Sequence, residues 1–262
     1  MSVSRAAARR GDAGQPLPTV YQGLADRQAH LARGQLALIV GPPSAGKSLL
    51  AMNLLVRMGL PALALLLDID KTSAVARFGA IVSGDRFADV RASVDSYRPQ
   101  LDAECGHIQT AFSATEADDI RTQMAAYEQR YGQPPDVLLV DNLGNLTSGY
   151  ENEWAVLKAL TLELDVLARE EQCAVIAAHH TSDLTSCEPA QRDKILGKIS
   201  QYPRLILSVG FNPQTTEYKI AVVKNSSGPS DPGATNPVVL WADPSRMLLT
   251  ENPQRAAAWR AA

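Results

Sequence analysis

The chain of 262 residues is long enough for one large domain, and its 45% of hydrophobic and 20% of charged residues exclude a globally disordered protein. Its 25 basic and 28 acidic side chains give a net charge of −3, which excludes a protein that coats nucleic acid by bulk charge. The three cysteines form no C-x-x-C pair, and no apolar run reaches the ~18–20 residues of a membrane helix. We therefore expect a soluble, cytoplasmic protein without a disulfide scaffold, a zinc knuckle or a membrane partner.

Neither end of the chain has apolar periodicity. Residues 1–17 contain three arginines, which is typical either of a mitochondrial-type transit peptide or, as we favour, of a flexible N-terminal tail. Residues 252–262 indicate a flexible C-terminal tail. Residues 18–251 contain no internal repeat and no low-complexity linker, so we expect a single domain there.

Short apolar strands alternate with helices along the first two thirds of this domain. The expected strands are Leu36–Val40, Ala62–Leu67, His107–Ala111, Val137–Val140, Ala174–Ala178, Arg204–Val209, Tyr218–Val223 and Val238–Trp241. The expected helices are Lys47–Met58, Ser73–Val82, Asp85–Glu104, Ala117–Tyr131 and Glu153–Glu171. This alternation predicts an α/β fold with a mostly parallel twisted sheet and flanking helices. After Pro203, strands follow one another directly, which indicates antiparallel strands added at the C-terminal edge.

A phosphate-binding motif lies between the first expected strand and the first expected helix. Gly41-x-x-x-x-Gly46-Lys47-Ser48 has the spacing of a P-loop. Its glycines let the backbone wrap an anion closely, Lys47 would reach the outer phosphates and Ser48 would ligate Mg²⁺. The motif therefore predicts ATP and Mg²⁺ as ligands. The expected ATP-binding residues of the loop are Gly41, Pro42, Pro43, Ser44, Ala45, Gly46, Lys47, Ser48 and Leu49.

An acidic residue ends another apolar strand. Asp141 directly follows Val137–Val140, and α/β sheets bind ligands at the carboxyl ends of their strands. We expect Asp141 to help to hold Mg²⁺. The alternative is that Asp141 caps the next turn, because Asn142 and Gly144 follow it.

The order of these parts resembles the RecA-type P-loop ATPase core, in particular the motor domain of DnaB-like and RepA-like hexameric replicative helicases. The resemblance runs from about Thr19 to Thr250. It implies a RecA-like fold, ATP hydrolysis, single-stranded DNA as a partner and a homo-oligomer, most simply a hexameric ring. A phage or plasmid origin is compatible with it.

In the DnaB-like family a Glu at the end of the second strand activates the attacking water, and an Arg follows nine residues later. Asp68 and Arg77 have that spacing here, so the resemblance assigns the catalytic carboxylate to Asp68. A carboxylate facing the γ-phosphate can orient the water or accept its proton. Asp70 is the rival for this role, and either residue could merely cap the helix that starts near Ser73.

Two histidines follow the strand Ala174–Ala178. RepA-like proteins carry a His here that contacts the γ-phosphate and couples hydrolysis to the DNA loop. His180 matches that position, and His179 is its alternate. A structural role for the pair stays open. A zinc site is less favoured, because only Cys187 lies nearby.

The DNA-facing loop of the family corresponds to Gly197–Gln201. The resemblance implies that Lys194 and Lys198 bind DNA phosphates from the centre of a ring, although a solvated loop would look the same. Three aromatic residues near the expected DNA loops can stack on a base, although packing is the commoner role of such residues: Tyr150, Trp154 and Tyr202.

A Lys-x-Arg pair reaches the neighbouring subunit's ATP in this family. Lys224 matches the Lys, which adds it to the expected ATP-binding residues, but Ser226 stands in place of the Arg. That Arg stabilises transition-state charge in trans. Either Lys224 acts alone, or Arg204 or Arg246 substitutes, or hydrolysis is slow.

Three functions are compatible with these features. The leading hypothesis is an ATP hydrolase of the DnaB-like helicase or translocase type, acting on single-stranded DNA in replication. The alternative is a RecA- or KaiC-type recombination or repair ATPase with little unwinding activity. A small-molecule kinase is less favoured, because no arginine-rich lid is evident.

Overall fold

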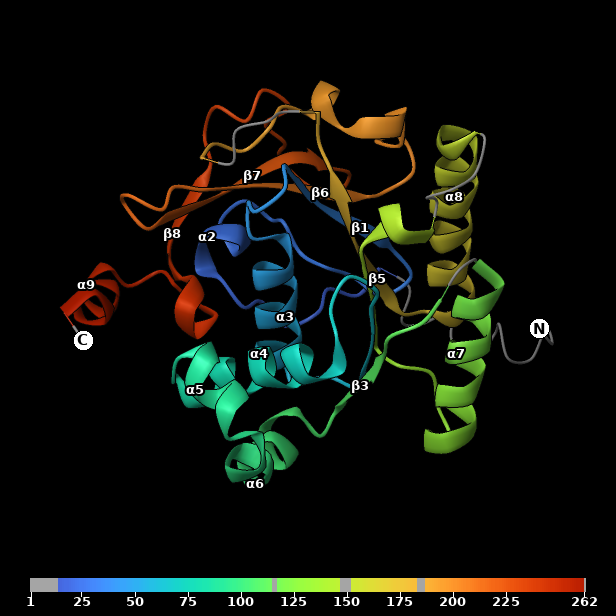
Figure 1. The fold of residues 1–262 in the computed structure, drawn as a ribbon. Helices are drawn as coiled ribbons and strands as arrows, with labels where there is room; N and C mark the ends of the chain where they lie inside the picture. The colour runs from blue at the N-terminus through green and yellow to red at the C-terminus, as the bar shows by residue number, and fades with distance from the viewer. Residues whose placement is uncertain (1–13, 115–116, 147–151, 183–186, 262) are drawn as a thin grey trace.

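The computed structural model describes residues 14–114, 117–146, 152–182 and 187–261 (Figure 1). Within them the strands form one nine-stranded sheet in the order β3-β2-β4-β5-β1-β6-β7-β8-β9. The strands from β3 to β6 in this order run parallel, and β7, β8 and β9 are antiparallel. The strands are β1 Leu36–Gly41, β2 Ala62–Leu66, β3 Ile108–Ala111, β4 Val137–Asp141, β5 Ala174–His180, β6 Leu205–Phe211, β7 Glu217–Asn225, β8 Val238–Asp243 and β9 Leu248–Thr250.

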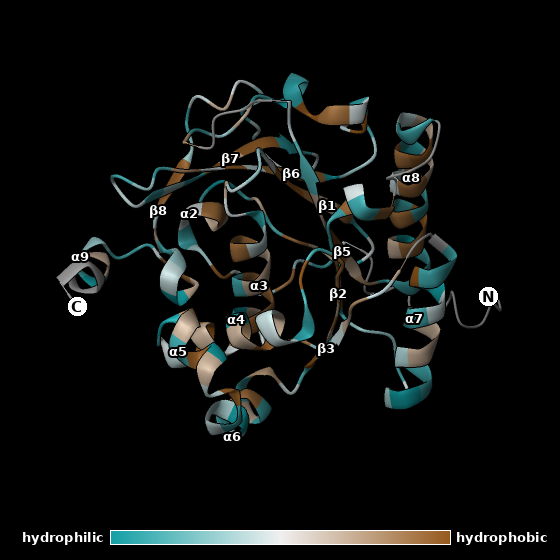
Figure 2. Ribbon diagram, in the orientation of Figure 1, coloured by the Kyte–Doolittle hydropathy of each residue, from teal (hydrophilic) through white to brown (hydrophobic). Residues whose placement is uncertain are grey.

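Helices cover both faces of the sheet. On one face lie α2 (Gln22–Ala25), α3 (Lys47–Met58) and α4 (Lys71–Ser83). The helices α5 (Phe87–Ala92) and α6 (Val94–Cys105) pack on α4. The other face packs against α7 (Ala117–Tyr131) and α8 (Glu153–Glu171), which lie together on one flank in Figure 1. Hydrophobic residues gather on the strands and on the helix turns that face them, whereas the outer loops are largely hydrophilic (Figure 2).

Alternation along each central strand divides the core into these two halves. In β1, Ala37 and Ile39 join the cluster under α3, which we call the α3 face. Leu38 and Val40 join the cluster under α8, which we call the α8 face. Successive side chains of a strand point to opposite faces. Within one strand, therefore, residues two positions apart share a face, which assigns the residue at the strand end to one of the two faces.

The predicted α/β fold with antiparallel strands at the C-terminal edge is confirmed, and all eight expected strands are present. Asp85–Glu104, expected as one helix, forms α5 and α6 with a break at Ser93. The strand β9 was not expected, because it is only three residues long and depends on pairing with β8. No helix among the described residues combines the length and apolar character needed to cross a membrane.

Both expected tails contain ordered contacts. Pro253–Ala261, expected as part of a loose end, forms the helix α9, because Asn252 accepts hydrogen bonds from the backbone of its first turn and Ala256 is buried. At the other end, Leu17 is buried and its backbone N–H bonds to Leu31. Asn252, followed by Pro253 as the first residue of α9, was a helix-start signal that the lack of apolar periodicity concealed.

Candidate active site

Four adjacent strands end at one edge of the sheet. They are β2, β4, β5 and β1, which are neighbours in the sheet order. The parallel pairing brings Leu66 opposite Asp141 and Gly41 opposite His180. The residues expected to act on ATP follow these strand ends, so the topology brings together segments that are far apart in the sequence.

The phosphate loop depends on two glycines for its shape. Gly41 has no room for a side chain, because a Cβ there would lie 2.8 Å from the Val209 carbonyl oxygen of β6. Gly46 has a φ of 85°, which favours glycine, and it precedes the first residue of α3. The loop therefore delivers Lys47 and Ser48 at the N-terminus of a twelve-residue helix, where backbone N–H groups attract anions.

Lys47 is only 7% exposed. Its Nζ donates to the carbonyl oxygens of Gly41 and Pro42 at 3.0 and 2.9 Å and lies 3.3 Å from Nδ1 of His180. Burial lowers the pKa of Lys47 to about 8, and Asp141 and Asp68 oppose this shift. The buried ammonium therefore lies beside two carboxylates, in a position to exchange loop carbonyls for phosphate oxygens.

Asp141 is buried at the end of β4. Burial raises its pKa, while a hydrogen bond with Ser48 and the positive charges of Lys47 and Arg77 oppose the shift. The Ser48 hydroxyl and the Asp141 carboxylate are oxygen ligands of the kind that Mg²⁺ prefers, and a cation would compensate the buried negative charge. The residues present therefore fit a magnesium–nucleotide complex.

The two histidines at the end of β5 lie on opposite faces. His180 follows the parity of the α3 face and contacts Lys47. An ammonium has no acceptor, so Nδ1 of His180 is the acceptor and its proton is on Nε2. Burial, followed by the charge of Lys47, lowers the pKa of His180, which keeps the ring neutral.

His179 follows the parity of the α8 face, and its Nε2 lies 3.2 Å from the Leu196 carbonyl oxygen. Burial lowers its pKa to about 4. His179 therefore contacts the segment that contains the expected DNA-binding lysines, whereas His180 contacts the phosphate loop.

The two candidate carboxylates after β2 also differ. Asp70 is the N-cap of α4 and accepts hydrogen bonds from the Ser73 N–H at 2.9 Å and the Ser73 hydroxyl at 2.6 Å. These bonds lower the pKa of Asp70. Asp68 instead lies close enough to raise the pKa of Lys47, His180 and Asp141 by its charge. The geometry therefore favours Asp68 over Asp70 as the carboxylate of the cluster.

Lys194 and Lys198 lie outside this cluster, on an exposed segment formed by two short 3-10 turns, η2 (Arg192–Lys194) and η3 (Leu196–Lys198). The Ser182 N–H donates to the Lys194 carbonyl at 2.9 Å, and Thr181 pairs with Ile195. The segment is therefore tied to the end of β5.

Gly197 packs directly on α8, because a Cβ there would lie 2.4 Å from Leu157 and 3.1 Å from Trp154. Trp154 is 50% exposed and lies beside this segment, while Tyr202 packs against the α8-face core. Tyr150 lies outside the described residues.

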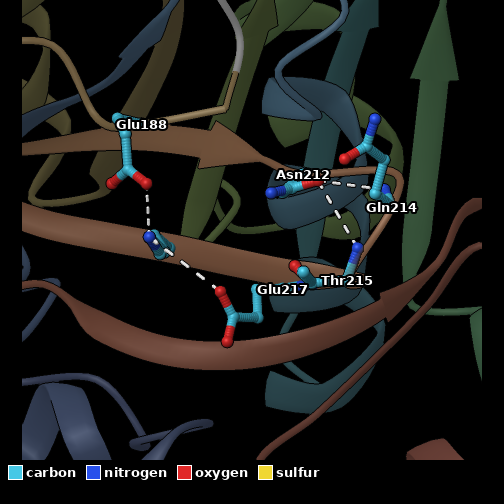
Figure 3. A network of polar contacts seen from close by, with 6 residues as sticks. Glu188, Asn212, Gln214, Thr215 and Glu217 are labelled. Atoms are coloured by element: carbon cyan, nitrogen blue, oxygen red, sulfur yellow. Dashed lines mark hydrogen bonds and ion pairs between the residues drawn. The ribbon is translucent and has the colours of Figure 1, made fainter.

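Figure 3 shows a second tether, at the start of β7 and the residues before η2. Lys219 forms an ion pair with Glu188 and lies 3.9 Å from Glu217. Asn212, in the turn before β7, accepts hydrogen bonds from the Gln214 and Thr215 backbone. A hydrogen-bonded turn therefore leads into β7, whose Lys219 contacts the stretch before η2.

Lys224 lies near the end of β7 and is likewise not part of the nucleotide cluster of its own chain. Its Nζ donates to the Ser200 and Gln201 carbonyl oxygens at 2.8 and 2.9 Å. Burial lowers its pKa, and the charges of Arg192 and Arg204 add to the shift. Lys224 therefore belongs to a basic group near the η2–η3 segment.

Arg204 and Arg246, the two candidates to replace the missing arginine of the Lys-x-Arg pair, differ in how firmly their own chain holds them. Arg246 pairs with Asp243 at 3.2 Å and donates to the Gly84 carbonyl at 3.1 Å, which holds it within its own chain. Arg204 is exposed and lies near Lys224. Ser226 is also exposed, and its N–H donates to the Arg204 carbonyl at 2.8 Å.

Two residues of interest were not expected from the sequence. Tyr218 is fully buried in β7, and its hydroxyl donates to the Gly46 carbonyl of the phosphate loop at 2.8 Å. Arg192 adds a third exposed basic side chain to η2 and η3. No local pattern marks Tyr218, since 172 positions separate it from its partner, whereas Arg192 stands two residues before Lys194 and its charge could have been noticed.

A comparison with protein families matches residues 11–185 to a family described as an AAA domain. The chain belongs to this AAA domain family. The AAA domain is 30% identical to the Gene 65 protein of Mycobacterium phage L5, over 85% of this chain and 88% of that protein. It is 26% identical to the Gene 65 protein of Mycobacterium phage D29, over 77% of this chain and 92% of that protein.

Solved structures show the same RecA-like fold as this AAA domain. One of them, described as an ATPase domain, is similar with a TM-score of 0.76 at 14% identity, covering 95% of this chain and 96% of that one. A DnaB-like replicative helicase, from a structure that treats its interactions with primase, is similar with a TM-score of 0.75 at 14% identity. The match covers 95% of this chain and spans 64% of the length of that helicase chain.

Proposed function

We propose that this AAA domain hydrolyses ATP at the β1–β4–β5 edge and uses the reaction to move along single-stranded DNA as a DnaB-like helicase or translocase. The observation that carries the proposal is the cluster of Lys47, Asp141 and His180, in which three buried or half-buried polar groups meet at adjacent strand ends. The likeness of fold to a DnaB-like replicative helicase supports the DNA-directed part.

Each group of the cluster has a part in the proposed reaction. Lys47 neutralises charge on the outer phosphates, and Asp68 orients the attacking water or accepts its proton. The Nε2–H of His180 donates to a γ-phosphate oxygen, so its partner disappears when phosphate leaves. Mg²⁺, held by Ser48 and Asp141, supplies further charge neutralisation on the phosphates.

Assembly into a hexameric ring is part of the proposal. Each subunit presents few basic side chains on the η2–η3 segment, namely Arg192, Lys194 and Lys198. The chain as a whole carries a charge of −3. Six copies around a channel would multiply these contacts, whereas one subunit offers little for a phosphate backbone. Lys224 would act on the ATP of the neighbouring subunit.

The test is the ATPase rate with and without single-stranded DNA, combined with sizing in the presence of Mg·ATP. We expect a ring whose turnover DNA stimulates and whose activity Lys47→Ala and Asp68→Ala abolish. Asp70→Ala is the matched control and should retain activity if α4 stays folded. A rate that DNA does not change would exclude the motor.

The alternative is a RecA- or KaiC-type recombination or repair ATPase. Ser226, in place of the arginine of the DnaB-like pattern, favours it, because loss of that charge slows hydrolysis and hence unwinding. DNA binding that depends on ATP, without strand separation of a forked duplex, would support this alternative.

A further inference from the structure

Tyr218 lies directly beneath the phosphate loop. It is the second residue of β7, which is separated from β1 only by β6, and its side chain is fully buried in the α3-face core. Its hydroxyl donates to the Gly46 carbonyl oxygen at 2.8 Å. A Cβ on Gly46 would lie 2.7 Å from Cε2 of the ring, so the ring is in close contact with the loop backbone.

The bonded carbonyl belongs to the peptide that joins Gly46 to Lys47. In a planar trans peptide the C=O and the following N–H point in opposite directions. The same Gly46 carbonyl accepts the Leu50 N–H at 3.1 Å, which is the first helical bond of α3. Holding this oxygen toward α3 and Tyr218 therefore directs the Lys47 N–H toward the N-terminal side of the helix, into the loop.

We propose that Tyr218 is a positioning residue of the phosphate loop, whose hydroxyl fixes the Gly46–Lys47 peptide so that Lys47 is oriented for the phosphates before nucleotide binds. This role rests on the proposed use of ATP at the loop. Burial raises the pKa of Tyr218 well above its ordinary value, so its hydroxyl remains a donor over the working range of pH. Gly46 needs its positive φ, and Tyr218 stabilises the conformation that uses it.

Tyr21 offers a matched control for the loss of one buried phenol oxygen. It is 2% exposed and lies near Tyr218, but among the described residues its hydroxyl has no hydrogen-bond partner. Tyr218→Phe and Tyr21→Phe therefore remove the same atom from the same region, and only the first removes a bond to the loop.

The experiment compares wild type, Tyr218→Phe, Tyr21→Phe and Lys47→Ala, with Mg·ADP binding measured by calorimetry and ATPase kinetics in parallel. We expect Tyr218→Phe to raise both the Kd for Mg·ADP and the KM for ATP by about threefold to tenfold, the effect of one hydrogen bond, and to leave kcat within about twofold. Tyr21→Phe should match wild type. Melting curves without nucleotide establish that both variants fold.

Two results would overturn the role in different ways. If wild type binds Mg·ADP, Lys47→Ala loses it and Tyr218→Phe still binds like Tyr21→Phe, the positioning role is wrong and the proposed ATP site stands. If wild type binds no Mg·ADP, the ATP site itself is wrong, and the role of Tyr218 is lost with it.

Discussion

The sheet edge with Lys47, Asp141 and His180, which we call the nucleotide edge, and the η2–η3 segment use polar side chains in opposite ways. At the nucleotide edge, Lys47, Asp141 and His180 are withdrawn from solvent and contact one another or the loop backbone. In the η2–η3 segment, Lys194 and Lys198 are exposed, and backbone contacts hold the segment in place. The first arrangement fixes charges for chemistry at the expense of desolvation, whereas the second presents weak surface charges that need repetition to bind.

One strand end joins the two regions. His180 faces the phosphate loop, while its neighbours His179 and Thr181 hold the η2–η3 segment. Under the proposed use of ATP, a change at the γ-phosphate would have a path of three residues, 179–181, to the η2–η3 segment. Variants in each region test whether the buried groups act on the nucleotide and the exposed groups on DNA.

Apart from Lys47→Ala and Asp68→Ala, which should abolish activity, the largest effect is expected from Asp141→Asn. A bound metal ion supplies several kcal/mol of charge stabilisation, and each 1.4 kcal/mol is about tenfold in rate, so kcat should fall at least about 100-fold. The pKa of Asp141 is raised, so its ionised form at neutral pH destabilises the nucleotide-free fold. The variant should therefore melt at a higher temperature than wild type at pH 7, and at a more similar temperature in acid.

Asp136→Asn is the control, because Asp136 directly precedes the first residue of the same strand. Asp136 pairs with Arg33 far from the nucleotide edge, so its variant should keep its ATPase rate and melt slightly lower. Equal ATPase losses in both variants, or a wild-type Mg²⁺ dependence in Asp141→Asn, would contradict the assignment of Asp141.

The second prediction concerns Lys224. Lys224→Ala should lower kcat by about 10- to 100-fold, less than an arginine finger, because an ammonium is a point charge without a fork. If Lys224 acts in trans, mixing Lys224→Ala with Lys47→Ala subunits should restore about a quarter of the sites, since each restored site needs one subunit of each kind in the right order.

The two variants measured separately provide the baseline for this mixture. No recovery on mixing, with rings confirmed by sizing, would place Lys224 in a structural role, in which its bonds to the Ser200 and Gln201 carbonyls only hold the chain before β6. Its third N–H, which those two bonds leave over, is the one expected to reach the neighbouring phosphate.

The third prediction follows from the lowered pKa of Lys47, about 8 in the free chain. Bound phosphates favour the protonated amine of Lys47. At pH 9 only about one tenth of the free protein carries this proton. The affinity for Mg·ADP should therefore fall roughly tenfold between pH 7.5 and 9. Folded Lys47 binds fewer protons than unfolded Lys47 between pH 8 and 10.5, so its burial penalty on stability fades as pH rises through this window.

Lys47→Arg separates the charge from its titration. A guanidinium stays protonated throughout, so the variant should bind more weakly but with no loss of affinity between pH 7.5 and 9. The same downward slope in Lys47→Arg would assign the pH dependence to another group.

The placement of the phosphate loop and of Asp141 at neighbouring strand ends could be predicted, because local order determines it. Gly41, Gly46 and Lys47 stand close together in the sequence, and Asp141 ends an apolar run, so neither needs a distant partner to be noticed. The choice of Asp68 over Asp70 could not be made in this way. It depends on a cap bond to Ser73 and on charges that meet only when the sheet is assembled.

The histidines show the same limit of prediction from local sequence order. Parity along β5 would have separated His179 from His180 if the strand had been known to continue through both, but the expected strand ended at Ala178. Tyr218 had no local signal at all, because its role comes from packing across β6. Local sequence patterns thus mark most of the candidate site residues, whereas they do not mark the residues that support them, such as Tyr218.

The smallest effect is expected at the Lys219–Glu188 pair, next to Tyr218 on β7. Adjacent strand residues point to opposite faces, so β7 contacts the phosphate loop with Tyr218 and the stretch before η2 with Lys219. The Glu188 side chain is 63% exposed, so the pair is worth less than about 1 kcal/mol and is weakened by salt. Glu188→Lys and Lys219→Glu should each lower DNA stimulation by at most about fivefold at low salt, with the KM for ATP unchanged.

The double exchange, with Glu188→Lys and Lys219→Glu together, restores the pair with its charges reversed and should recover most of the stimulation, the remainder being lost because a carboxylate at position 219 repels Glu217. Recovery with a constant KM would mean that the two sides of β7 act separately, Tyr218 on the nucleotide and Lys219 on the basic segment. A KM that follows the charge exchange would instead mean that β7 transmits strain from one region to the other. The contrast between a buried nucleotide edge and an exposed η2–η3 segment would then be incomplete, because one strand would set the geometry of both.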